Sequence, residues 1–182
     1  MSTDKRLEIE VKIRIAARLL CREELLALGA ELSHARILER NLVFDTPGRE
    51  LKEQGILLRL RRAGRRSILT MKTPAGRASA YKIREETETI VSVFSAMEKI
   101  LSGIGFLPVF IYEKFRETFR LGRVLIMLDE TPIGDFIEIE GDPGAIDDVA
   151  SRLGFSQKDY ITDSYHRLFL LSGRSGDMIF AP

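Results

Sequence analysis

The sequence is poor in the residues that build disulfide frameworks and most metal clusters. Its 182 residues include one cysteine, Cys21, two histidines, His34 and His166, and no tryptophan. A single cysteine excludes an internal disulfide, and two histidines are too few for a histidine-based metal cluster. Any metal ion bound by this chain therefore has to take oxygen ligands.

Long apolar runs are also missing. No stretch approaches the roughly 20 apolar residues that a membrane-spanning helix needs. Residues 7–15, LEIEVKIRI, alternate charged and apolar side chains, unlike the continuous apolar part of a secretory signal. We therefore expect no membrane association and a cytoplasmic location.

The charge balance argues against a nucleic-acid partner. The chain has 28 basic and 27 acidic residues, a net charge of +1. Residues 59–66, RLRRAGRR, are strongly basic but contain no interleaved aromatic residue. A small molecule is the expected partner; the oligomeric state stays open, with a homodimer as one option.

What the sequence does contain is a series of runs that alternate charged and apolar residues with the period of a β-strand. In each run, one face is apolar and the other carries Arg, Lys and Glu. Turn-forming residues separate the runs, which favours antiparallel hairpins. The runs span residues 7–15, 55–62, 81–90, 111–121 and 134–141.

Helical patterns lie between and after these runs, at residues 17–30, 93–106, 142–155 and 160–171. The third has Asp142 at the N-cap, Pro143 in the first turn and Gly154 after the last turn. The length suits a single domain, residues 1–182, with a loosely held tail at residues 173–182.

Any one charged strand face would be explained by contact with water. The concentration of arginines and carboxylates at alternate positions of nearly every strand instead indicates a closed barrel with a charged lumen and helices packed outside. Buried charges of both signs are costly unless a ligand or metal balances them. A triphosphate with Mg²⁺ or Mn²⁺ fits, because Arg and Lys bind phosphate and carboxylates bind hard cations.

The motifs resemble those of the CYTH family, also called triphosphate tunnel metalloenzymes. Glu8, Glu10 and Lys12 form its ExExK signature, followed by LLRLRR, LTMKTP, KIREETE, EKFRETF, MLDETPIGDFIEIEG and SYHRLF in that order. The resemblance implies an α+β, mainly antiparallel fold: a closed barrel of about eight strands. It also implies a metal-dependent enzyme acting on a triphosphate.

The resemblance also implies roles for individual residues. The metal ligands would be Glu8, Glu10, Asp129, Glu138 and Glu140. The triphosphate would be bound by Lys12, Arg59, Arg61, Lys72, Arg84, Lys114 and Arg116. Glu86 and Lys72 would be catalytic. His34, His166, Ser164 and Tyr165 receive no role.

Three functions follow as alternatives. The first is hydrolysis of the terminal phosphate of an inorganic or organic triphosphate, such as tripolyphosphate or thiamine triphosphate. The second is a class IV adenylyl cyclase, although residues 3–7 lack the His-Phe pair that precedes ExExK in bacterial cyclases. The third is a non-catalytic module that binds triphosphate or polyphosphate. Retention of all five carboxylates favours an enzyme, and the missing tryptophan disfavours specificity for thiamine.

Overall fold

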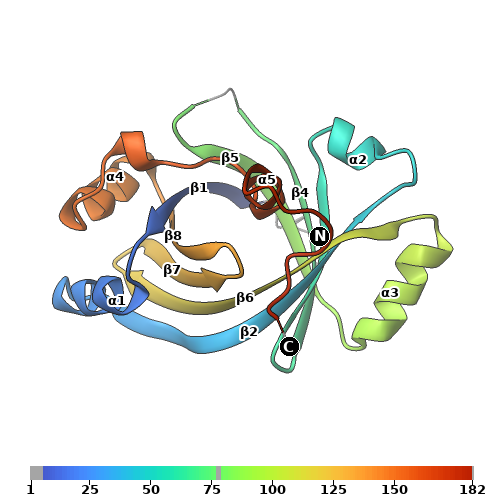
Figure 1. The fold of residues 1–182 in the computed structure, drawn as a ribbon, viewed down its shortest axis with the longest axis horizontal. Helices are drawn as coiled ribbons and strands as arrows, with labels where there is room; N and C mark the ends of the chain where they lie inside the picture. Colours follow the sequence, from blue (N-terminus) through green and yellow to red (C-terminus); the bar gives the residue numbers. More distant parts are fainter. Residues whose placement is uncertain (1–5, 77–78, 182) are drawn as a thin grey trace.

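The charged strands form one closed barrel in the computed structural model, which describes residues 6–76 and 79–181 (Figure 1). Paired strands are antiparallel and follow the order β1-β5-β4-β3-β2-β6-β7-β8, with β8 returning to β1. The expected α+β fold, an eight-stranded closed barrel with helices outside, is confirmed. The strands are β1 (Arg6–Ile15), β2 (Glu31–Asp45), β3 (Leu57–Ala63), β4 (Arg66–Pro74), β5 (Lys82–Ile90), β6 (Leu107–Leu121), β7 (Val124–Thr131) and β8 (Gly134–Glu140).

Two tight hairpins fix the register of the strands. Ala63 pairs with Arg66 between β3 and β4, and Leu121 pairs with Val124 between β6 and β7. Each two-residue loop begins with a glycine at positive φ, 57° at Gly64 and 60° at Gly122. A side chain is disfavoured in this conformation, and such turns match the twist of paired strands.

The apolar outer faces are covered by helices on opposite sides of the barrel (Figure 1). Leu25 and Ile146, from α1 and α4, pack on a core that includes Ile13 and Ile139. On the other side, Leu101 of α3 packs in a core with Leu60. The helices are α1 (Arg18–Ala27), α2 (Glu50–Glu53), α3 (Phe94–Gly103), α4 (Pro143–Arg152), a short 3₁₀ helix η1 (Gln157–Asp159) and α5 (Tyr165–Leu171).

Helix α5 differs from the others because its first turn reaches the lumen. The Ser164 hydroxyl caps the helix by accepting a hydrogen bond from the Arg167 amide at 3.2 Å. The ring of Tyr165 packs edge-on against Phe136 of β8, with centroids 5.4 Å apart, and lies 6.2 Å from Tyr112 of β6. A helix was predicted within residues 160–171, and α5 confirms it; Ser164, Tyr165 and His166 at its start line the lumen.

The end of the chain is held more firmly than the sequence indicates. Met178 is fully buried, and its backbone pairs with β6: its amide donates to Ile111 and its carbonyl accepts from Glu113. The Asp177 carboxylate accepts from the Ile111 amide at 2.8 Å. The prediction of a loosely held tail is therefore wrong for these residues, because an unpaired edge of β6 supplies hydrogen bonds. Pro182 lies outside the described residues.

No helix within the described ranges has both the length and the apolar character needed to cross a bilayer.

Candidate functional site

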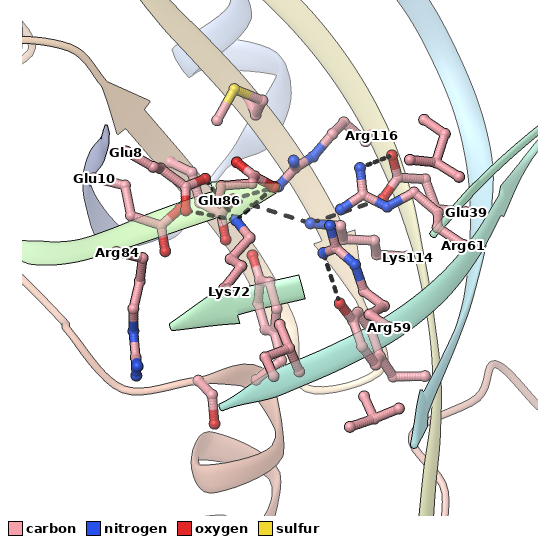
Figure 2. Close-up of a pocket in the computed structure, with 18 of the residues that line it drawn as sticks. Glu8, Glu10, Glu39, Arg59, Arg61, Lys72, Arg84, Glu86, Lys114 and Arg116 are labelled. Atoms are coloured by element: carbon pink, nitrogen blue, oxygen red, sulfur yellow. Dashed lines mark hydrogen bonds and ion pairs between the residues drawn. The ribbon is translucent and has the colours of Figure 1, made fainter. Parts of the chain in front are cut away.

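The lumen of the barrel is a cavity of about 1130 Å³. Alternate residues of the strands point into it, as the period of two requires. Their charged side chains separate into an acidic group and a basic group (Figure 2). The predicted residues that line the cavity are Glu8, Glu10, Lys12, Arg59, Arg61, Lys72, Arg84, Glu86, Lys114, Arg116, Glu138 and Glu140.

Lys72 is the centre of the acidic group. From β4, its ammonium donates to both carboxylate oxygens of Glu8 on β1, at 2.5 and 2.6 Å. It also lies 3.3 Å from Glu86 on β5. One ammonium therefore compensates two carboxylates from neighbouring strands.

Glu10 and Glu138 continue this acidic group along β1 and β8. Glu10 accepts from Lys82 at 2.6 Å, and Glu138 lies 2.9 Å from Lys12. Burial and the neighbouring Glu138 oppose ionisation of Glu10, but Lys82, Lys12 and Lys72 together outweigh them and hold the pKa of Glu10 at about 2. This carboxylate is ionised at neutral pH, and Lys82 is its partner.

The basic group comes from β3 and β6. Arg59 donates to the hydroxyls of Tyr112 and Thr70 at 3.4 and 3.3 Å. Arg61 donates to Asn41 and Glu39 at 3.1 and 3.3 Å. Lys114 and Arg116 follow on β6, with Lys114 almost fully buried. The cations come from rigid strands, so their donors are fixed in place before a ligand arrives.

Glu86 has the properties of a proton acceptor. Burial raises the pKa of this carboxyl, Lys72 opposes the shift, and Glu8 and Glu88 add to it, so the pKa reaches about 7. A carboxylate with a pKa near neutrality can take up a proton during turnover and release it afterwards. Glu10, Glu39 and Glu138 behave in the opposite way, because despite their burial neighbouring cations lower the pKa of each of these carboxyls.

Two predicted residues are placed differently from the rest. Asp129 is fully buried and does not line the cavity; it accepts from Lys114, from Arg116 and from the Tyr165 hydroxyl, at 2.6 to 2.8 Å. Arg84 lines the cavity, but its guanidinium turns away from the other cations and donates to the Gly55 carbonyl at 2.7 Å (Figure 2).

Sequence reasoning missed several cavity residues. Glu39 lines the cavity from β2, within a segment whose sequence shows no clean alternation, and Asn41 on the same strand accepts a hydrogen bond from Arg61. Tyr112 and Tyr165 were not assigned to the site, yet Tyr165 faces the ammonium groups of Lys12 and Lys114 at 4.4 and 4.9 Å from its ring centre. The alternation of Tyr112 with Lys114 and Arg116 is the signal that could have found it.

The carboxylates on β1 and β8 fit a hard divalent cation by their chemistry. Glu10 lies opposite Glu140 in the sheet register. Burial raises the pKa of Glu140, and of its charged neighbours Arg6 opposes this shift whereas Glu8 and Glu10 add to it, as expected where acids crowd together. Across the described ranges, no three His, Cys, Asp or Glu side chains form a preassembled cluster, because Lys and Arg pair with these acids. Bound metal would replace those contacts.

Comparison with known proteins bears directly on this arrangement. The CYTH domain profile matches residues 6–165, which include every strand of the barrel. The chain belongs to the CYTH family. No curated protein matches the sequence.

Solved structures share the CYTH barrel. A protein of Vibrio parahaemolyticus, named as a candidate adenylate cyclase, has a TM-score of 0.81 at 20% identity, covering 92% of this chain and 99% of its own. The PH1819 protein of Pyrococcus horikoshii has 0.76 at 26%, covering 92% and 99%. A Hippeastrum protein, named as a candidate adenylyl cyclase with a dominant triphosphatase activity, has 0.64 at 19%, covering 92% and 97%. At identities of 20% and 19%, the TM-scores of the first and third structures show a shared fold and nothing further.

Proposed function

We propose that this CYTH protein is a divalent-metal-dependent triphosphatase that hydrolyses the terminal phosphate of an inorganic or organic triphosphate. The observation that carries the proposal is the division of one cavity into an acidic group and a basic group, with Glu86 and Lys72 on the acidic side. Such a reaction requires metal ligands and phosphate ligands, and the acidic and basic groups that would supply them line the same cavity.

The basic group would bind the phosphate chain. Arg59, Arg61 and Arg116 offer guanidinium groups that can bind phosphate oxygens in pairs, and Lys12 and Lys114 add point charges. The arginines also stabilise the charge that develops on the equatorial oxygens in the transition state. Positions fixed by strand pairing reduce the reorganisation that this binding requires.

Glu8, Glu10, Glu138 and Glu140 would hold Mg²⁺ or Mn²⁺. The bound ion supplies charge neutralisation for the triphosphate and orientation of its terminal group. Asp129 is proposed as a positioning residue, because its oxygens are occupied by Lys114, Arg116 and Tyr165.

Glu86 would accept the proton of the attacking water. The water oxygen forms a bond to the terminal phosphorus, and the bond from that phosphorus to the bridging oxygen breaks in line with it. The water proton passes to the Glu86 carboxylate, and the diphosphate leaves with its charge balanced by the basic group. Lys72, 3.3 Å from Glu86, orients the carboxylate and supports its ionised form.

The test is incubation with Mg²⁺ or Mn²⁺ and, separately, tripolyphosphate, thiamine triphosphate and ATP, with products resolved by phosphorus NMR. Orthophosphate release is the expected result. Glu86→Gln should lower kcat by about 10²–10⁴-fold with little change in KM. Glu85→Gln is the matched control, because Glu85 lies next to Glu86 on β5 with the opposite strand parity. Equal activity of both variants would contradict the role of Glu86.

Adenylyl cyclase activity is the second candidate, supported by the names of structural neighbours in the same family. It would use the same phosphate-binding and metal-binding side chains, with the ribose 3′-hydroxyl attacking the α-phosphate and pyrophosphate leaving. Cyclic AMP and pyrophosphate from ATP in the same assay would establish it. If no substrate turns over, a non-catalytic triphosphate-binding module becomes the better description.

A further inference from the structure

Glu39 is a carboxylate in the basic group for which the proposed reaction has no use. It lies on β2, opposite Lys114 of β6 in the sheet register, and is 4% exposed. Its Oε1 accepts from Arg61 at 3.3 Å, whereas Oε2 is buried without a hydrogen-bond donor and lies 4.0 Å from Lys114. The acid is thus held mainly by the surrounding charge.

The surroundings keep this acid ionised. Burial opposes the charge, but Arg61, Arg116, Lys114 and Arg59 together hold the pKa of Glu39 at about 2. Figure 2 shows Glu39 beside the guanidinium of Arg61, with Arg59 and Lys114 close by. A fixed negative charge therefore stands where phosphate oxygens would be bound.

One cation beside Glu39 also has an unsatisfied donor. The Nε of Arg59 is buried and has no acceptor. The Nε of Arg61 donates to the neutral amide oxygen of Asn41 at 3.1 Å. Buried donors without partners are costly, and an incoming phosphate oxygen can satisfy them. The basic group therefore has a free donor for a phosphate oxygen, but it also contains the Glu39 carboxylate, which repels phosphate.

We propose that Glu39 is a specificity-determining residue: its carboxylate is the resident counter-anion of the basic group and limits how much phosphate charge that group accepts. This inference rests on the proposed function. Repulsion between Glu39 and a bound phosphate chain grows with the charge of the chain. Glu39 therefore penalises a longer, more highly charged chain more than a shorter one.

The test is calorimetric titration with pyrophosphate, tripolyphosphate and tetrapolyphosphate in EDTA at constant ionic strength. Glu39→Gln keeps an oxygen acceptor for Arg61 and removes the charge. We expect its affinity for tripolyphosphate to rise by about tenfold or more, equivalent to about 1.4 kcal/mol. The gain should be larger for tetrapolyphosphate and smaller for pyrophosphate.

Two further variants make the result specific. Asn41→Asp adds a charge beside Arg61 and should weaken tripolyphosphate binding by about tenfold. Glu113→Gln makes the same charge change as Glu39→Gln on a strand position of opposite parity to Lys114, where Glu113 pairs with Arg40 at 2.6 Å. Its affinities should stay within about twofold of the wild type.

Unchanged or weaker binding by Glu39→Gln would overturn the proposal, and so would an equal gain for all three phosphates or a gain in Asn41→Asp. Circular dichroism and thermal unfolding establish that each variant is folded. Because binding in EDTA needs no turnover, failure of phosphate release with Mg²⁺ would refute the proposed function and leave this test readable.

Discussion

The sequence predicts that Asp129 binds metal, whereas its contacts in the structure suit a residue that positions Lys114 and Arg116. In the structure, its carboxylate has no exposed surface and accepts four hydrogen bonds from Lys114, Arg116 and Tyr165. The variant Asp129→Asn has nearly the same shape and removes the charge. If Asp129 positions the cations, the main loss should be in stability; if it holds metal, the main loss should be in metal binding.

The size of the stability loss follows from the partners left behind. Without the charge of Asp129, Lys114 keeps Glu138 and Glu39 only at 4.0 Å, and Arg116 keeps Glu138. Breaking one partner of a buried ion pair costs about 3–5 kcal/mol. We expect the lower end, about 3 kcal/mol, because these acids remain. For a chain of this size, this corresponds to a fall in Tm of about 6–12 °C.

The assay is thermal unfolding in EDTA, followed by titration with Mn²⁺. Tyr165→Phe is the control, since it removes the neutral donor and keeps every charge; it should cost about 1.5 kcal/mol. The Mn²⁺ affinity of Asp129→Asn should change by less than about fivefold, or about 1 kcal/mol. A fall in Tm of under about 2 °C together with complete loss of Mn²⁺ binding would refute this reasoning and restore Asp129 as a ligand.

Four further predictions concern the two groups in the cavity and the core around it. Glu10→Gln should abolish metal-dependent turnover in a protein that circular dichroism shows to be folded; full activity would remove Glu10 from the metal site. Arg59→Ala should weaken tripolyphosphate binding by about 1.5–3 kcal/mol, measured by calorimetry, because charge-assisted hydrogen bonds are lost; an unchanged affinity would mean that Arg59 does not reach the substrate. Burial, only partly offset by Lys72, raises the pKa of Glu86 from 4.5 to about 7, so the folded state binds more protons in this window and stability falls as pH rises through it. Glu86→Gln lacks this titration, and its Tm should therefore gain on the wild type between about pH 5 and pH 8; a constant difference would contradict the raised pKa. Phe119→Ala, at a fully buried core position, should lower the free energy of unfolding by about 3–5 kcal/mol in a denaturant titration, and a loss below about 1 kcal/mol would show that the site collapses around the change.

The barrel was predictable because most strands carry their burial pattern in the sequence. In β1, Val11 and Ile13 are buried beneath helices, while Glu10 and Lys12 face the lumen. Strict alternation makes such a strand readable from one sequence, since a shift by one residue would exchange the two faces. The same reasoning placed the charged residues of β5, β6 and β8 in one cavity.

The strand β2 was not predictable in this way. Its first eight residues are exposed, so neither face was under pressure to be apolar, and its pairing with β6 contains register shifts near His34. His34, which was assigned no role, lies in this exposed part of the strand. Glu39, which lies at the point where β2 enters the covered part of the barrel, was missed with it.

The hydrogen-bond partners of the charged residues could not be predicted from the sequence either. The alternation of residues along each strand predicts that Asp129, Lys114 and Arg116 point to the inside of the barrel. It does not predict how deeply each side chain is buried. Only the three-dimensional placement of Tyr165, 36 residues further along the chain, completes the hydrogen bonds around Asp129. The tail after residue 172 was misread for a similar reason, because its polar composition gives no sign of the β6 edge that binds Met178.

The closure of the barrel has a consequence for how this chain folds. Strand β1 is the first strand in the sequence, yet its two edges pair with β5 and β8. One edge of β1 therefore stays unpaired until almost half of the chain has been made, and the other stays unpaired until β8 arrives and closes the ring. Contacts between such distant segments slow folding, and an unpaired strand edge invites association with other chains. Refolding from denaturant should accordingly be slow, and its yield should fall as the protein concentration rises.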